Sequence, residues 1–282
     1  MLATHAPFIT RAPRDVAGWV ALFQHARLPV LSRTALALEE MRLNEDAVDA
    51  HLLADEIGSD PLMTLKVLAL VAHLRRGREG SEVETVTEAL VMLGIPPFFR
   101  NFGAQEVAQE RLAEQPQALA GFEHVLRRSH RAARFAIGFA VHRMDHDAPV
   151  IHQAALLHDF AELLLWLQAP ALALEMQRLQ ASDSTLRSAT VQKRLLNVEL
   201  GELQHALMKA WRLPSLLVHI TDDHALVPSA QVRNVQLAIR VARHSARDWG
   251  NAALPDDIDA IAELLQMSPD ATTRLLREID SE

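Results

Sequence analysis

Residues 59–76, SDPLMTLKVLALVAHLRR, decide the fold class because they carry a complete helix signal. Asp60 stands at a favoured N-cap position. Pro61 follows at the first helical position, where its missing N–H costs nothing. A long apolar run comes next, so the segment predicts a helix.

The segments on both sides repeat this signal. Residues 32–43 (SRTALALEEMRL) begin at a capping-type Ser32, and residues 47–60 (AVDAHLLADEIGSD) contain the helix stop Gly58. Residues 79–102 (EGSEVETVTEALVMLGIPPFFRNF) predict a helix, a stop at Gly94 and a break at Pro96–Pro97. Helical segments continue to the C-terminus without a convincing alternating strand. We therefore predict an all-α fold with no substantial sheet.

Composition narrows the class of protein. With 49% hydrophobic and 23% charged residues, the chain has enough apolar surface to fold. There is no cysteine, so any metal must be held by His, Asp or Glu. We expect a soluble cytoplasmic protein without a membrane partner, because no run of about 18 apolar residues occurs.

The net charge of −8 argues against broad nucleic-acid binding. A local basic face on residues 126–135 (LRRSHRAARF) remains a minor alternative, although a solvated helix face is the commoner interpretation. Its arginines are Arg127, Arg128, Arg131 and Arg134.

One apolar segment carries two chemically active residues, His158 and Asp159, within AALLHDFAELLLW, residues 154–166. A buried carboxylate needs a partner, which is either a metal, a helix terminus or an arginine. Further metal donors are His130 and the stretch HITDDH, residues 219–224, unless the latter simply ends a helix in solvent. Trp166 and Trp211 follow apolar runs and are predicted to lie in the core.

The order of these segments resembles the HDOD family, relatives of HD-domain metal phosphohydrolases found in bacterial signalling. The resemblance covers about residues 28–246 and rests on LPVLSRTALALEEMRL, ADEIGSDPLMTLKVLALV, VETVTEALVMLGIPPFFRNF, RRSHRAARFA, AALLHDFAELLLW, AWRLP and HITDDHA. It implies HD-domain-like helices preceded by an N-terminal helical bundle. We expect a flexible arm at 1–15, an N-terminal half at 16–110, an HD-like half at 111–250 and C-terminal helices at 251–282.

The resemblance also assigns site residues. His130 matches the first histidine of catalytic HD proteins, and His158 with Asp159 matches the HD pair. Arg243 stands where a later aspartate is usual, and its permanent positive charge would repel a divalent ion. Asp223–His224 replaces a His-His pair, and Ala72–His73 replaces an Asn-Ser. The metal candidates, in a degenerate site, are therefore His130, His158, Asp159 and His224. The binding candidates are Arg127, Arg131, Asp223 and Arg243.

Two functions follow as expectations. The favoured one is a non-catalytic signal-transduction or regulatory module that needs no cofactor. It would act in trans on a signalling protein or through a bound nucleotide, because no receiver or cyclase motif is recognisable. The alternative is a phosphohydrolase whose divalent metal would activate water for attack on a phosphoester or nucleotide.

Overall fold

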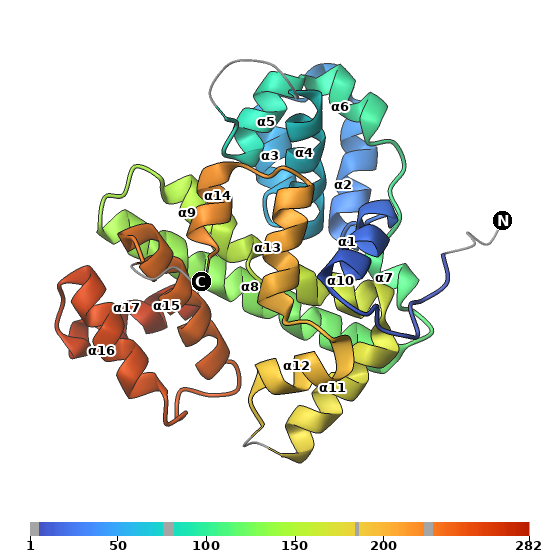
Figure 1. Cartoon of the computed structure of the whole chain (residues 1–282). Helices are drawn as coiled ribbons and strands as arrows, with labels where there is room; N and C mark the ends of the chain where they lie inside the picture. The colour runs from blue at the N-terminus through green and yellow to red at the C-terminus, as the bar shows by residue number, and fades with distance from the viewer. Residues whose placement is uncertain (1–5, 76–81, 184–185, 223–227, 282) are drawn as a thin grey trace. The chain divides into compact units, whose positions relative to one another are not determined.

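Helices joined by loops make up the part of the chain that the structure describes (Figure 1). The computed structural model describes residues 6–75, 82–183, 186–222 and 228–281. Within these ranges the only paired extended backbone is an isolated parallel bridge between Val30 and Val107. The prediction of an all-α fold is confirmed.

Two compact units divide the chain, and each combines two separate stretches of sequence. Unit 1 comprises residues 1–125 and 160–213, and unit 2 comprises residues 126–159 and 214–282. The longest helix, α8 (Pro116–His142), contributes to both. The boundaries expected near residues 15, 110 and 250 follow chain order, whereas the units follow packing.

Unit 1 is built around buried aromatic and aliphatic side chains. Trp19 and Phe23 of α1 are buried, and the Trp19 Nε1–H donates to the carbonyl of Leu196 at 2.8 Å. Helix α1 packs on α13, and α3 and α4 pack on α5. Residues 6–15, the described part of the expected arm, are tied to this unit by the bond from Ile9 N–H to the Gln168 carbonyl at 2.7 Å. Its helical elements are α1 (Val16–His25), α2 (Ser32–Leu43), η1 (Glu45–Ala47), α3 (Ala50–Ile57), α4 (Pro61–Leu74), α5 (Val86–Leu93), α6 (Ile95–Asn101), α7 (Ala108–Arg111), α10 (Phe160–Gln168), α11 (Pro170–Ser182), α12 (Ser188–Leu196) and α13 (Leu200–Ala210).

Unit 2 centres on α15, which packs against α9 and α16, while α16 packs on α17. Asn234 of α15 is fully buried and donates through its side-chain amide to the Ala136 carbonyl of α8 at 3.2 Å. Besides its part of α8, the unit contains α9 (Ala148–Leu157), α14 (Ser215–Ile220), α15 (Ala230–His244), α16 (Leu254–Leu265) and α17 (Pro269–Ser281).

Local signals place several helix ends correctly. The Asp60 carboxylate accepts the N–H groups of Leu62 at 2.8 Å and Met63 at 3.0 Å, and Pro61 is the first residue of α4. Helix α3 ends before Gly58. Helix α5 ends before Gly94, whose φ of 78° suits glycine. The predicted N-cap and both glycine stops are confirmed.

Two local predictions are wrong. Ser32 is the first residue of α2 instead of its cap, because tertiary partners satisfy the free N–H groups: Leu31 N–H donates to Asp60, and Ser32 N–H donates to the side chain of Gln109. Pro96 and Pro97 do not interrupt helical structure. They occupy the first turn of α6, where proline is tolerated.

The apolar segment Ala148–Gln168 is long and apolar enough to cross a membrane by length and composition. Within the described residues it is the single such segment, and 89% of its most apolar 18-residue window is buried inside the structure. A core helix passes the same test, so this is weak support for a membrane span. His158 and Asp159 lie at the turn inside it, between α9 and α10.

Candidate functional site

Asp159 is the centre of a buried ion-pair network in unit 2. Its side chain is only 5% exposed. Arg128 of α8 donates to Oδ2 through Nε at 2.8 Å and Nη2 at 2.7 Å, and Arg243 of α15 donates to Oδ1 at 2.7 Å. One carboxylate therefore holds two cationic side chains from two helices.

These charges decide the protonation state of Asp159. Burial alone would raise the pKa of its carboxyl. The guanidinium groups of Arg128 and Arg243, together with a hydrogen bond from His158, instead hold that pKa well below its usual range. His158 is itself buried, and its Nδ1 lies 3.1 Å from Asp159 Oδ1. Asp159 is thus an ionised acceptor at neutral pH.

The predicted metal ligands are brought together only in part. His158 and Asp159 are in contact. Burial lowers the pKa of His152 of α9, and the nearby His130 of α8 lowers it further. His224 and the binding candidate Asp223 lie outside the described residues. Among the residues described, no group of three or more His, Asp or Glu side chains is placed to hold a metal ion.

This arrangement does not suit a divalent cation. Arg128 and Arg243 already occupy both oxygens of Asp159, and a guanidinium keeps its charge at all physiological pH values. An ion bound to the same carboxylate would lie within a few ångströms of two positive charges, or would have to displace them. Of the three partners considered for the buried carboxylate, a metal, a helix terminus or an arginine, the structure shows arginine.

A cavity of about 510 Å³ adjoins the network within unit 2. We call it the arginine cavity, because three arginines of α15 line it: Arg233, Arg240 and Arg243. Arg240 follows Arg233 by seven positions and Arg243 follows Arg240 by three, so the three share one face of the helix. Each arginine has an acidic partner: Glu263, Asp257 at 2.6 Å and Asp159 at 2.7 Å, respectively. Since a guanidinium has several N–H donors, each can still bind a second anionic group. The remaining lining residues are His158, Pro228, Gln236, Leu237, Ile239 and Ala260.

The α8 arginines have different roles. Arg131 donates to both oxygens of Asp280 at 2.7 and 2.9 Å and to Ser245 Oγ at 2.8 Å, which ties α8 to α17 and to the end of α15. Arg127 is exposed. Arg128 and Arg131 form ion pairs with acids of the same unit, Asp159 and Asp280. The α8 arginines therefore do not form one open basic face.

Sequence reasoning missed Arg128 as the second partner of Asp159, and Arg233 and Arg240 as cavity residues. The spacing of Arg233, Arg240 and Arg243 was a usable signal, because it predicts one cationic stripe on a helix. Sequence reasoning also missed Asp257, which is fully buried and contacts both Arg240 and His244. A buried acid in the first turn of a helix has no local signature that distinguishes it from a solvated one.

Comparison with known proteins agrees with this architecture. The chain aligns over 89% of its length with 98% of the MmoQ response regulator from Methylococcus capsulatus str. Bath, with a TM-score of 0.68 and 21% identity. It aligns over 93% of its length with 97% of a virulence factor from Campylobacter jejuni subsp. jejuni, with a TM-score of 0.62 and 17% identity. These likenesses show a shared fold. No curated protein sequence matches significantly. The HDOD domain profile matches residues 28–226, more than half of the chain, and the protein therefore belongs to the HDOD domain family.

Proposed function

We propose that this chain is a non-catalytic signal-transduction module whose degenerate HD site binds a phosphate-bearing nucleotide, and that it acts in trans on a signalling protein. The supporting observation is the pairing of Asp159 with Arg128 and Arg243. In a metal-dependent phosphohydrolase this carboxylate would bind the ion that activates water. Here two guanidinium groups take that position, and they activate no water.

The arginine cavity supports the choice of ligand. Arg233, Arg240 and Arg243 present guanidinium groups, which match phosphate oxygens in geometry and charge. Leu237, Ile239 and Ala260 supply apolar wall against which a base or ribose can lie. The volume of about 510 Å³ is in the range of small-molecule sites.

The wider setting is also part of the proposal. One structural neighbour is named a response regulator, and this agrees with a regulatory role. Both named neighbours are bacterial, and the apolar segment at the site is mostly buried. We therefore infer a bacterial, cytoplasmic protein that requires no metal cofactor and binds neither membrane nor nucleic acid.

Metal analysis and hydrolysis assays test the non-catalytic part. We expect the purified protein to hold no stoichiometric divalent metal and to leave phosphomonoesters and cyclic dinucleotides intact. A turnover that depends on added Mn²⁺ and disappears in His158→Ala would instead establish the metal-dependent phosphohydrolase.

Calorimetric titration with inorganic phosphate, AMP and a cyclic dinucleotide tests the binding part. Arg233→Gln is the most informative variant. Its acidic partner Glu263 is 71% exposed, so the substitution leaves no buried carboxylate without a partner. One charged hydrogen bond contributes about 1.5–3 kcal/mol, so nucleotide affinity should fall about tenfold or more. Arg247→Gln, an exposed arginine outside the cavity, is the matched control and should bind normally. Equal affinity in both variants, or no binding by the wild type, would refute nucleotide recognition here.

A further inference from the structure

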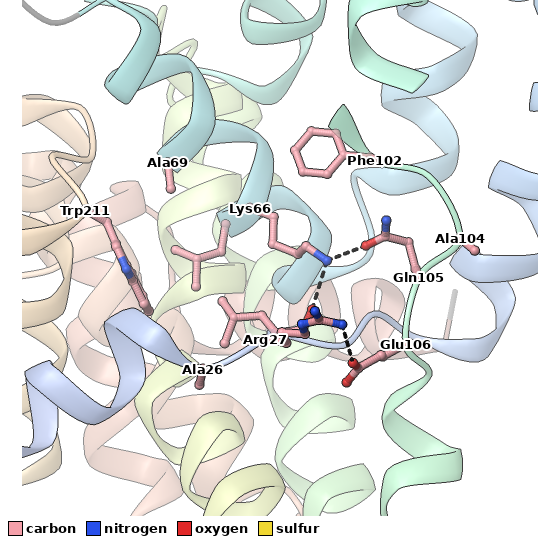
Figure 2. Close-up of a pocket in the computed structure, with 11 residues that line it drawn as sticks. Ala26, Arg27, Lys66, Ala69, Phe102, Ala104, Gln105, Glu106 and Trp211 are labelled. Atoms are coloured by element: carbon pink, nitrogen blue, oxygen red, sulfur yellow. Dashed lines mark hydrogen bonds and ion pairs between the residues drawn. The ribbon is translucent and has the colours of Figure 1, made fainter. Parts of the chain in front are cut away.

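A second cavity, of about 400 Å³, lies wholly within unit 1 (Figure 2). It is called the lysine cavity here, because Lys66 of α4 is its central charged group. The segment before α2 and the segment before α7 form its other polar walls. The lining residues are Ala26, Arg27, Leu28, Leu65, Lys66, Ala69, Phe102, Ala104, Gln105, Glu106 and Trp211.

Lys66 is held by both flanking segments. Its Nζ donates to the carbonyl of Leu28 at 2.8 Å and to Oε1 of Gln105. An ammonium group has three N–H donors, so one is left after these two bonds. Burial lowers the pKa of Lys66 to about 8, against the opposing effect of the acids Asp60 and Glu106. The amine is therefore mostly protonated at neutral pH and has one donor to spare.

The other two charged residues of the lining, Arg27 and Glu106, have opposite charges. Arg27 and Glu106 form an ion pair of 3.7 Å, in which the Arg27 side chain is 88% exposed. The Asp60 carboxylate is not part of the lining, since it is turned toward backbone N–H groups at the starts of α2 and α4. One positive charge, that of Lys66, is left to face the cavity. The site is thus suited to a single negative charge.

The walls around this charge are largely apolar. In the view of Figure 2, Trp211 lies on one side of Lys66 and Phe102 on the other. Leu65 and Ala69, on the same helix as Lys66, also belong to the lining. Trp211 follows the last turn of α13 and is half-buried, although aromatic residues usually gain most by full burial. A ligand with a flat apolar body would cover this surface.

We propose that the lysine cavity binds a small organic carboxylate, with the carboxylate accepting the remaining N–H of Lys66 and the apolar body lying against Trp211 and Phe102. This site belongs to unit 1 and is separate from the arginine cavity of unit 2. A bound acid would also reinforce Lys66 as the link between α4 and the segments around Leu28 and Gln105.

The test uses 2-naphthoate as probe and 2-naphthamide as its uncharged match, titrated calorimetrically into the full chain at millimolar concentration. We expect saturable binding of naphthoate and about tenfold to hundredfold weaker binding of the amide, the range that one charged hydrogen bond supplies. Lys66→Met keeps the length of the side chain and should lower naphthoate affinity by the same factor, with a much smaller effect on the amide, whose carbonyl accepts only a neutral-acceptor hydrogen bond from Lys66. Lys193→Met, at an exposed lysine of the same unit, should change neither.

Ala69→Phe fills the cavity with Lys66 intact and should reduce the affinity for both probes. Above about pH 8, loss of the Lys66 proton should weaken naphthoate binding and leave the amide unaffected. Of the other charged groups nearby, Arg27 keeps its charge in this range. Burial raises the pKa of Asp60, but its side chain is turned toward backbone N–H groups and is not part of the lining. Naphthoate that does not bind the wild type, or that binds Lys66→Met and the wild type equally, would overturn the proposal. A failure here leaves the arginine cavity untouched, since nucleotide binding is measured with different variants.

Discussion

Removing Arg128 should destabilise the protein more than removing Arg243, although both bind the same carboxylate. Arg128 is 12% exposed and Asp159 is 5% exposed, so Arg128→Met takes a buried cation from a buried anion. Breaking a buried pair from one side costs about 3–5 kcal/mol. Since Arg243 and His158 still contact Asp159, we expect the lower end, about 3 kcal/mol. Arg243 is 44% exposed, and its pair is screened by water, so Arg243→Met should cost about 1 kcal/mol or less.

A double-mutant cycle in urea measures this difference. Asp159→Asn removes the charge on which Arg128 depends, so Arg128→Met should cost about 2 kcal/mol less in that background. Far-UV circular dichroism and tryptophan fluorescence should give coincident unfolding curves, which makes the free energy of unfolding well defined. Arg247→Met, which lacks an acidic partner among the described residues, is the control. Equal costs for Arg128→Met and Arg243→Met, or a coupling near zero, would refute the reasoning.

Three further predictions concern single positions. Because the pKa of Asp159 is depressed in the folded state, its stabilisation is present above the unfolded value of about 4 and is lost as pH falls through the folded-state pKa. The difference in free energy of unfolding between wild type and Asp159→Asn should therefore shrink in acid, and a constant difference contradicts this. Asp60→Ala removes the acceptor of three backbone N–H groups and should cost about 2–4 kcal/mol in urea unfolding, with a cost below about 1 kcal/mol counting against the cap. Gly121→Ala places a methyl group into the Trp166 indole and should lower the melting temperature, because overpacking costs about 1–3 kcal/mol and exceeds the gain in helix propensity of about 1 kcal/mol. A stabilised Gly121→Ala protein would show that the ring can move aside.

Helix ends were predictable where the residues that cap them are adjacent in sequence. Asp60 caps its own helix, and Gly94 has a backbone angle that few other residues adopt. Ser32 was misread because Gln109, 77 positions away, satisfies its N–H. A distant side chain that replaces a local cap has no local signature.

In the candidate site, too, some features could be predicted from the sequence and others depend on residues far apart in it. Comparison with the family pointed to Arg243 where an acid was expected, and the structure contains the ion pair between Arg243 and Asp159. Arg128 was considered only as part of a basic face, because sequence does not show which side of a helix meets a carboxylate 31 positions away. Trp211 was predicted to lie in the core, and the structure instead places it in the wall of the lysine cavity. It follows the end of α13 and is half-buried.

The proposed function can be compared with metal-dependent hydrolysis at an HD site in terms of charge. A divalent ion does two things in such a site: it attracts phosphate, and it lowers the pKa of a bound water so that hydroxide can attack. A guanidinium does only the first, because it attracts and hydrogen-bonds anions but offers no coordination position to water. Arg128 and Arg243 together bring two positive charges to Asp159, which leaves the cluster with one positive charge at neutral pH. Under the function proposed above, the arginines supply the attraction for a phosphate ester without the metal-bound hydroxide that would cleave it.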